Sequence, residues 1–197
     1  LKYPTISNYY SKYFPLIETE KMPTNEKCSA DNLRPEIRKF LNMMEERSKQ
    51  YPTLKDIPLP EARQIAEKIR KPFSTGGPVM HHVEEKHIPL SDGNIRIRLY
   101  YPTEERNLPG LFYLHGGGWV LFTLDTHNRL MREYASRANV CVIGIDYSHA
   151  PEKKYPTQIN EITDVILWCM EHGVELGLDV SQLSIGGDSA GGNLSIA

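Results

Sequence analysis

The chain has 197 residues, 40% of them hydrophobic and 24% charged, and its formal net charge is −2. This composition is typical of a globular protein with a sizeable core, and the near-neutral charge gives no general attraction to nucleic acid or anionic lipid. No apolar run approaches the roughly 20 residues of a membrane-spanning helix, so we expect neither a nucleic-acid partner nor a membrane span.

Apolar residues at helical spacing predict the first two helices, over residues 35–47 and 60–69. Asp31 or Asn32 is the expected cap of the first helix, because either side chain can accept a hydrogen bond from a free backbone N–H group. The second helix is expected to end before Pro72, since the residue that precedes a proline disfavours the helical conformation.

A segment rich in glycine, serine and proline at residues 74–78 predicts a linker, and the hydrophobic pattern changes there from helical to strand-like. We therefore divide the chain into an N-terminal helical cap segment, residues 1–75, and a core segment, residues 76–197.

The core segment is expected to begin with a β-hairpin. Strands are predicted over residues 83–90 and 95–101, joined by an Asp-Gly turn. In the second strand, Arg96 and Arg98 alternate with apolar residues, which predicts that one face of this strand is exposed to water.

Strands then alternate with helices, a pattern that favours a mostly parallel α/β sheet with helices on its faces. Asp125 is the expected cap of the first of these helices. The predicted strands are residues 111–114, 140–145 and 183–186, and the predicted helices are 126–137, 159–175 and one that opens at Ser189.

A glycine-flanked serine follows the last predicted strand, in the sequence Gly187-Asp188-Ser189-Ala190-Gly191. G-x-S-x-G between a strand and a helix is typical of a nucleophile elbow, a sharp turn that exposes the serine hydroxyl above the sheet. Small residues are required there, because a side chain at Gly187 or Gly191 would clash within the turn. The alternative interpretation is a glycine-rich turn that binds an anion or only reverses the chain.

A second motif, His115-Gly116-Gly117-Gly118, follows the strand at residues 111–114. In serine esterases such a loop supplies backbone N–H groups to the oxyanion that forms when the serine attacks an acyl carbon. The expected donors are the N–H groups of Gly117, Gly118 and Ala190, while His115 is expected to brace the loop. Alone, the glycines would fit a simple flexible loop equally well.

A general base for Ser189 is harder to find, since the expected chain order is Ser, then Asp or Glu, then His. Residues 190–197 contain none of the last three. His127 and His149 are weak upstream candidates, and His81, His82 and His172 are expected to lie at the surface. We therefore expect this chain to be an inactive portion of the machinery, truncated before its acid and histidine. Its last strand is expected to form an exposed sheet edge, and the isolated chain is expected to have low solubility.

Three scattered cysteines, Cys28, Cys141 and Cys169, do not form an obvious disulfide framework. Cys141 and Cys169 lie in apolar patterns and are predicted to be buried free thiols. This pattern favours a reducing compartment, and we expect a cytoplasmic location.

Taken together, these motifs resemble the hormone-sensitive-lipase group of α/β-hydrolase esterases, most of all its bacterial acetyl-esterase-like members. The resemblance covers about residues 30–197 and includes His115-Gly116-Gly117-Gly118-Trp119, Asp146-Tyr147 with Ala150-Pro151-Glu152, and the serine motif with Gly192. It implies an incomplete α/β-hydrolase fold, a serine carboxylesterase acting on short acyl esters, no organic cofactor and no metal. It also implies that the N-terminal helices form a cap that shapes substrate access.

Two other functions fit the same motifs. One is a non-catalytic protein that binds a small molecule on this scaffold, as the gibberellin receptors of plants do. The other is a peptidase or a longer-chain lipase, which would share the elbow. The sequence leaves the oligomeric state open, a homo-oligomer included.

Overall fold

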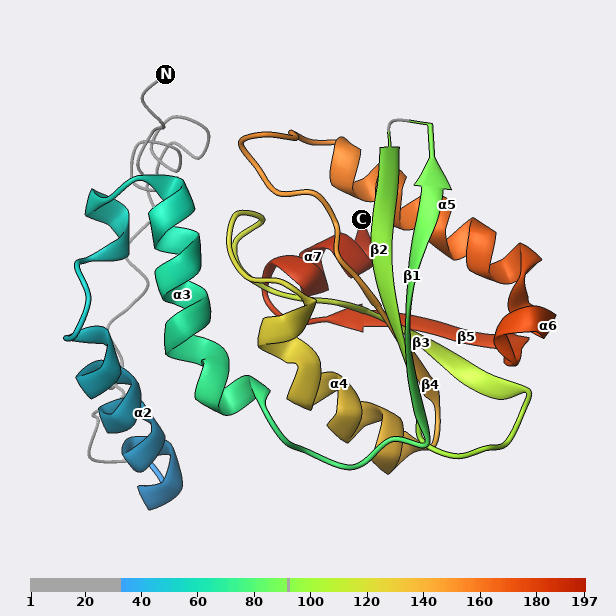
Figure 1. The fold of residues 1–197 in the computed structure, drawn as a ribbon, viewed down its shortest axis with the longest axis horizontal. Helices are drawn as coiled ribbons and strands as arrows, with labels where there is room; N and C mark the ends of the chain where they lie inside the picture. The colour runs from blue at the N-terminus through green and yellow to red at the C-terminus, as the bar shows by residue number, and fades with distance from the viewer. Residues whose placement is uncertain (1–32, 92) are drawn as a thin grey trace, which may run out of the picture. The chain divides into compact units, whose positions relative to one another are not determined.

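The computed structural model describes residues 33–91 and 93–197 of the chain (Figure 1). It divides into two compact units, Leu1–Ile69 and Arg70–Ala197. No helix of the described residues is long and apolar enough to cross a membrane.

The described part of the first unit is helical. It contains α2 (Pro35–Ser48), the short 3₁₀ helix η2 (Leu54–Asp56) and most of α3 (Leu59–Ser74). Arg34 is the N-cap residue of α2, without a side-chain cap, and the predicted caps Asp31 and Asn32 lie outside the described residues.

The predicted end of α3 before Pro72 is wrong, since the helix continues through this proline to Ser74. Pro72 lies in the last turn, where its missing N–H removes a single helical hydrogen bond. The Ser74 hydroxyl donates to the Lys71 carbonyl at 3.1 Å and helps to satisfy this end of the helix.

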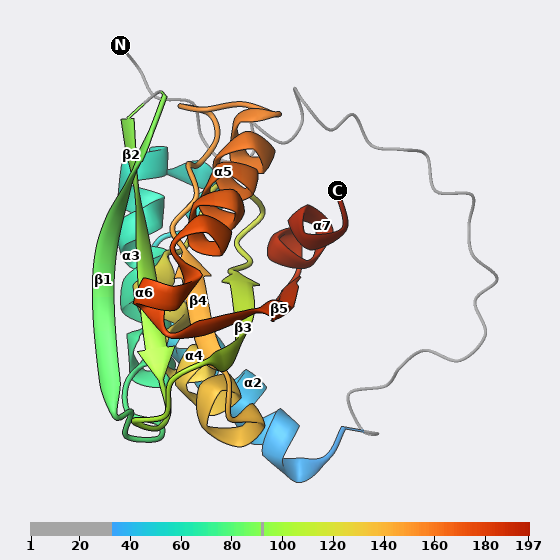
Figure 2. The same ribbon diagram turned by 90° about the vertical axis from the view of Figure 1, so that its right-hand side faces the viewer.

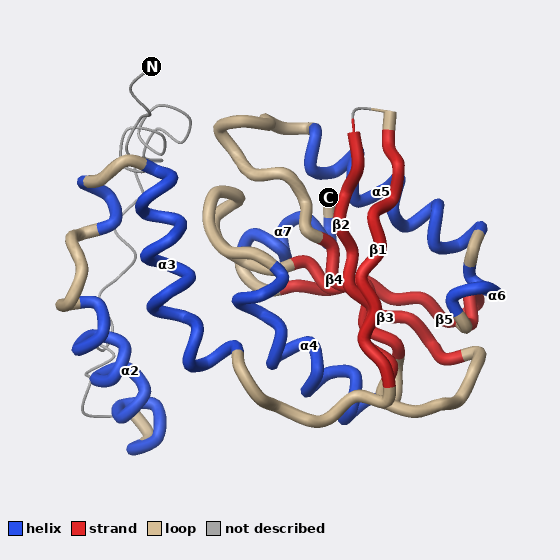
Figure 3. The backbone as a smooth tube through the Cα atoms, viewed as in Figure 1, coloured by secondary structure: helices blue, strands red, loops and turns tan. Residues whose placement is uncertain are grey.

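The second unit is built on a five-stranded mixed sheet of order β1-β2-β4-β3-β5 (Figures 1 and 3). Strands β1 and β2 form the predicted antiparallel hairpin, while β3 is parallel to both β4 and β5. The strands are β1 (His82–Leu90), β2 (Gly93–Tyr101), β3 (Leu108–Leu114), β4 (Cys141–Ile145) and β5 (Leu178–Gly187).

Helices cover both faces of the sheet, as predicted for an α/β fold (Figure 2). Side chains of α5 and α7 pack into the larger core cluster, and side chains of α4 pack into the smaller cluster on the other face. The helices are α4 (Leu124–Ala138), α5 (Thr157–Glu171), α6 (Gly173–Leu176) and α7 (Ala190–Ile196).

Strand β4 is buried at all five positions, as its continuous apolar sequence predicts. Cys141 on β4 and Cys169 on α5 are buried free thiols, which confirms the prediction for both, whereas Cys28 lies outside the described residues. Burial raises the pKa of both thiols to about 12, so both remain protonated.

The predicted water-exposed face of β2 is wrong. Arg98 is only 8% exposed, and its guanidinium donates to Glu85 and to Asp125 at 2.6 Å. Tyr100, on the same face, is fully buried and donates through its hydroxyl to Asn128 of α4 at 3.0 Å. A helix thus covers this face, and the charge of Arg98 is tolerated because acidic partners meet it there.

The predicted capping residue of α4 is also wrong. Thr123 is the N-cap, and its hydroxyl accepts a hydrogen bond from the backbone N–H of Asp125. The Thr126 hydroxyl accepts from the Thr123 N–H at 3.1 Å, which completes a reciprocal capping box. Asp125 lies in the first turn, where its carboxylate binds Arg98 instead.

Strand β5 forms one edge of the sheet (Figure 2), as predicted for the last strand. Val180 and Ile185 on this strand are 42% and 39% exposed, so the edge carries uncovered apolar surface. Exposed apolar sheet edges promote association between chains, and the predicted low solubility remains a prediction.

Candidate active site

The two glycine motifs meet where β3 and β5 end side by side. These strands are parallel neighbours, with Leu114 of β3 in register with Gly187 of β5. The next residues are also in contact, since the Gly116 N–H donates to the Asp188 carboxylate at 2.9 Å. The carboxyl ends of parallel strands are the edge where α/β proteins form their sites, and here that edge carries both motifs.

The elbow holds Ser189 in an unusual backbone conformation. Its φ and ψ are 51° and −116°, and the side chain is exposed. The Gly191 N–H donates to the Asp188 carbonyl at 2.8 Å, and the Asn193 N–H donates to the Ser189 carbonyl at 3.0 Å. A non-glycine residue in such a region costs about 1–3 kcal/mol, and strain of this kind concentrates at functional sites.

Two glycines of the elbow press against the end of β3. A Cβ atom at Gly187 or at Gly191 would clash with the Leu114 carbonyl, a backbone atom that cannot move aside. The sequence predicted that glycine is needed inside the turn. The structure adds a second reason, because the elbow also packs directly onto the neighbouring strand.

The loop after β3 turns sharply through left-handed conformations. Gly117 and Gly118 have φ values of 131° and 61°, and Trp119 and Phe122 also have positive φ values, 61° and 72°. The N–H groups of Val120 and Leu121 both donate to the Gly117 carbonyl, at 3.2 and 2.9 Å. These hydrogen bonds within the loop stabilise its turn.

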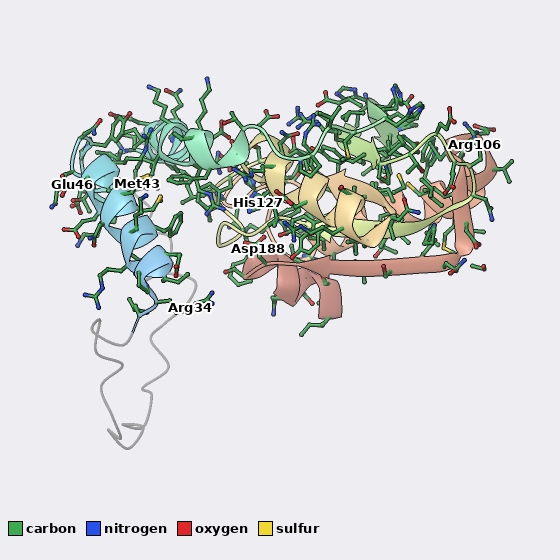
Figure 4. All side chains as sticks on the ribbon, turned by 90° about the horizontal axis from the view of Figure 1, so that it is seen from below. Arg34, Met43, Glu46, Arg106, His127 and Asp188 are labelled. Atoms are coloured by element: carbon green, nitrogen blue, oxygen red, sulfur yellow. The ribbon has the colours of Figure 1, made fainter. Side chains whose placement is uncertain are left out.

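The Asp188 carboxylate contacts residues from β3, from the glycine loop and from α4. Its Oδ1 atom accepts hydrogen bonds from the Tyr113 hydroxyl at 2.8 Å and from the Gly116 N–H at 2.9 Å. His127 Nε2 lies 3.4 Å from the same oxygen, and Figure 4 shows these two residues next to one another. Burial alone would raise the pKa of Asp188, but the contacts with His127, Tyr113 and Gly116 outweigh it and hold that pKa well below its ordinary value.

His115 is buried beneath the loop. Its Nδ1 atom donates to the Gly116 carbonyl at 2.7 Å, and its ring stacks on Tyr147 with centroids 4.6 Å apart. The Tyr147 hydroxyl in turn donates to the His115 carbonyl at 2.6 Å. Burial lowers the pKa of His115 to about 4, so the ring is neutral at pH 7. These contacts favour the predicted bracing role over proton transfer.

We expect His115 to make the stability of the protein depend on pH between about 4 and 6.5. Its folded pKa is lowered, so in this range the unfolded chain binds more protons and stability falls as the pH falls. Urea unfolding should therefore show a midpoint that drops from pH 7 to pH 4.5, and His115→Gln should flatten this slope. An unchanged slope in the variant would contradict the assignment.

Asp188 affects stability in a lower pH range. Because its folded pKa is depressed, its contribution to the free energy of unfolding is kept until the pH falls below about 4.

The histidines considered as upstream bases have other contacts. His127 is 1% exposed at its side chain and faces Asp188, and His149 lies edge-on against His115 at 5.7 Å. His172 stacks on Trp168 at 4.1 Å, and His82 stacks on Tyr101 at 5.8 Å. Such ring contacts favour structural roles for these side chains.

Tyr113, Tyr147 and the contact of His127 with Asp188 are parts of the site that sequence reasoning missed. Tyr113 is the next-to-last residue of β3, two positions before His115, and this place near a strand end was the available signal. Trp119, the residue after the glycines, packs against the core cluster. Phe122, in the same loop, lies under the Arg70 guanidinium at 4.6 Å.

Comparison with known proteins finds esterases among the proteins that are similar to this chain. Residues 111–197 match the family model of the α/β hydrolase fold. A protein of Acanthamoeba polyphaga mimivirus, named as an α/β hydrolase, is 33% identical over 194 residues, which are 96% of this chain and 53% of that protein. A carboxylesterase of Mycobacterium tuberculosis is 45% identical over 103 residues, 52% of this chain and 32% of that enzyme.

Solved structures agree. An esterase of the archaeon Pyrobaculum calidifontis superposes with a TM-score of 0.73 and 32% identity, covering 83% of this chain and 51% of that one. The predicted fold class and the predicted resemblance to esterases are thereby confirmed. The chain spans about half the length of the viral relative, and its match to the mycobacterial enzyme covers about a third of that enzyme.

Proposed function

We propose that this chain carries the nucleophile and the oxyanion donors of a serine carboxylesterase, because residues 111–197 match the family model of the α/β hydrolase fold and solved structures similar to the chain are esterases. The observation that carries the proposal is the direct contact of the two motifs, through the hydrogen bond from Gly116 to Asp188, the residue before Ser189. A serine motif without the glycine loop beside it would support the proposal far less.

In the proposed reaction, the Ser189 hydroxyl attacks the acyl carbon of the ester and loses its proton to a base. The carbonyl oxygen becomes an oxyanion, which the N–H groups of Gly117, Gly118 and Ala190 stabilise. The alcohol then leaves with a proton, and an acyl-enzyme remains on Ser189. Water attacks this acyl group, releases the carboxylic acid and restores the hydroxyl. These steps involve no metal and no organic cofactor.

We place the general base and its acid in a segment outside residues 1–197. All seven histidines of the chain lie among the described residues. In the two that lie nearest the motifs, His115 Nδ1 donates to the Gly116 carbonyl and His127 Nε2 lies 3.4 Å from the Asp188 carboxylate. The protein made of this chain together with that segment is called the extended protein below. We propose short-chain acyl esters as its substrates and a cap role for residues 1–75.

The 197-residue chain alone is expected to hydrolyse p-nitrophenyl acetate barely above the uncatalysed rate, because Ser189 has no base to activate it. The extended protein should hydrolyse the same ester at enzymatic rates and prefer acetyl and butyryl esters to long-chain ones. Turnover by the isolated chain that disappears in Ser189→Ala would refute the assignment of the base to another segment. Binding of esters without turnover by the extended protein would favour a non-catalytic binding protein.

A further inference from the structure

Asp188 occupies a position that the esterase mechanism does not use, yet three segments converge on it. The Tyr113 hydroxyl from β3 and the Gly116 N–H from the glycine loop donate to Oδ1, and His127 Nε2 from α4 lies 3.4 Å from the same oxygen. Its own backbone also closes the elbow, through the hydrogen bond from the Gly191 N–H to the Asp188 carbonyl. One residue therefore belongs to both halves of the oxyanion site.

The chain positions make this contact consequential. Asp188 directly precedes Ser189, and Gly116 directly precedes Gly117, so the 2.9 Å bond lies one residue away from the nucleophile on one side and from an oxyanion donor on the other. Gly116 also packs without space against this carboxylate, since a Cβ there would meet the Asp188 side chain. A shift of Gly116 would carry Gly117 and Gly118 with it.

The chemistry of the two donors, the Tyr113 hydroxyl and the Gly116 N–H, favours a carboxylate at this position. An ionised carboxylate only accepts hydrogen bonds, and it accepts them more strongly than a neutral oxygen does. Burial and the neighbouring Asp188 carboxylate hold the pKa of Tyr113 far above its ordinary value, so its hydroxyl remains a donor. An asparagine could retain one or two of the contacts, whereas an alanine would lose all three.

We propose that Asp188 is a positioning residue, whose carboxylate sets the glycine loop at the correct distance from Ser189. This inference rests on the proposed function for its kinetic consequence, but the contact itself can be tested without catalysis. The carboxylate touches neither substrate nor reacting atoms in this assignment. It acts through the placement of the Gly117 and Gly118 N–H groups.

The first test is amide hydrogen exchange of the 197-residue chain, read by mass spectrometry at residues 116–118. Asp188→Ala should speed exchange at these amides by at least tenfold and leave the buried strand β4 protected. Asp188→Asn should give an intermediate increase of a few fold. Asp179→Asn is the matched control, because it removes a carboxylate at the start of β5 whose hydrogen bonds among the described residues go to its neighbours Ser181 and Gln182. It should change nothing at residues 116–118.

The second test measures kcat and KM of the extended protein for p-nitrophenyl acetate. A misplaced donor lowers transition-state binding, so Asp188→Ala should lower kcat by about 100-fold with KM changed less than threefold, and Asp188→Asn should restore part of the loss. If the alanine variant unfolds, as loss of protection in β4 would show, the asparagine variant decides the matter. Unchanged exchange at residues 116–118 and unchanged kcat in that variant would overturn the proposal.

The two tests separate the positioning role from the proposed function. Suppose that Asp188→Ala speeds exchange at residues 116–118, but the parent extended protein hydrolyses no ester. This result would refute the esterase and support the positioning contact. Normal esterase turnover in Asp188→Ala would refute the positioning role and leave the esterase standing.

Discussion

Ser189→Ala in the extended protein is expected to lower kcat for p-nitrophenyl acetate by about 10⁵-fold or more, because the variant cannot form an acyl-enzyme. Ser189 is exposed, and its side chain contributes no hydrogen bond that caps α7, so the fold should not depend on the hydroxyl. KM should change little, and urea unfolding should be unaltered. The measurement is steady-state hydrolysis, with the unfolding midpoint recorded on the same preparation.

Ser181→Ala is the matched control for this experiment. Ser181 lies on β5, the strand that leads into the elbow, but it is exposed, and within the described part of the chain its hydroxyl bonds to Asp179 alone. This variant should keep the activity of the parent protein. Residual activity of Ser189→Ala within tenfold of the parent would show that another group is the nucleophile.

Gly191→Ala is expected to destabilise the protein by about 3 kcal/mol or more, although alanine is the better helix former by about 1 kcal/mol. Gly191 lies in α7, and an added methyl group would meet the Leu114 carbonyl and, at 2.8 Å, the His115 carbonyl. Neither backbone atom can move without separating the elbow from β3. Urea unfolding measures the effect, and activity should be lost with the geometry of the site.

Gly186→Ala provides the contrast for this prediction. Gly186 lies on β5 close to the elbow, but a methyl group there would have only Leu111 within reach, at 4.0 Å. Its free energy of unfolding should therefore change by less than about 1 kcal/mol. Equal destabilisation by both alanines would contradict the close packing of the elbow on β3.

Much of the core segment could be predicted because its local signals agree with its environment. The apolar run at residues 140–145 became the buried strand β4, and the two strands predicted over residues 83–90 and 95–101 pair as β1 and β2. The glycine motifs were located by their residue types alone, since only small residues tolerate the close approach at Gly187 and Gly191. The strand and the hairpin are decided by residues close together in the chain.

The errors arose where distant residues decide the outcome. The sequence pattern around Arg98 predicts a water-exposed residue. In the fold, α4 places Asp125 next to it, and this partner lies 27 positions away in the chain. The cap of α4 depended on the reciprocal bonds of Thr123 and Thr126, which compete with the stronger local preference of aspartate. The contacts of the Asp188 carboxylate could not be predicted either, because its three partners come from separate segments of the chain.

The most direct test of the central claim is the crystal structure of the extended protein after reaction with a p-nitrophenyl alkylphosphonate, whose phosphonyl oxygen imitates the oxyanion. We predict a covalent bond from Ser189 Oγ to phosphorus. The phosphonyl oxygen should lie about 2.7–3.1 Å from the backbone nitrogens of Gly117, Gly118 and Ala190. A phosphonate attached to another residue, or an oxygen turned away from the glycine loop, would contradict the account.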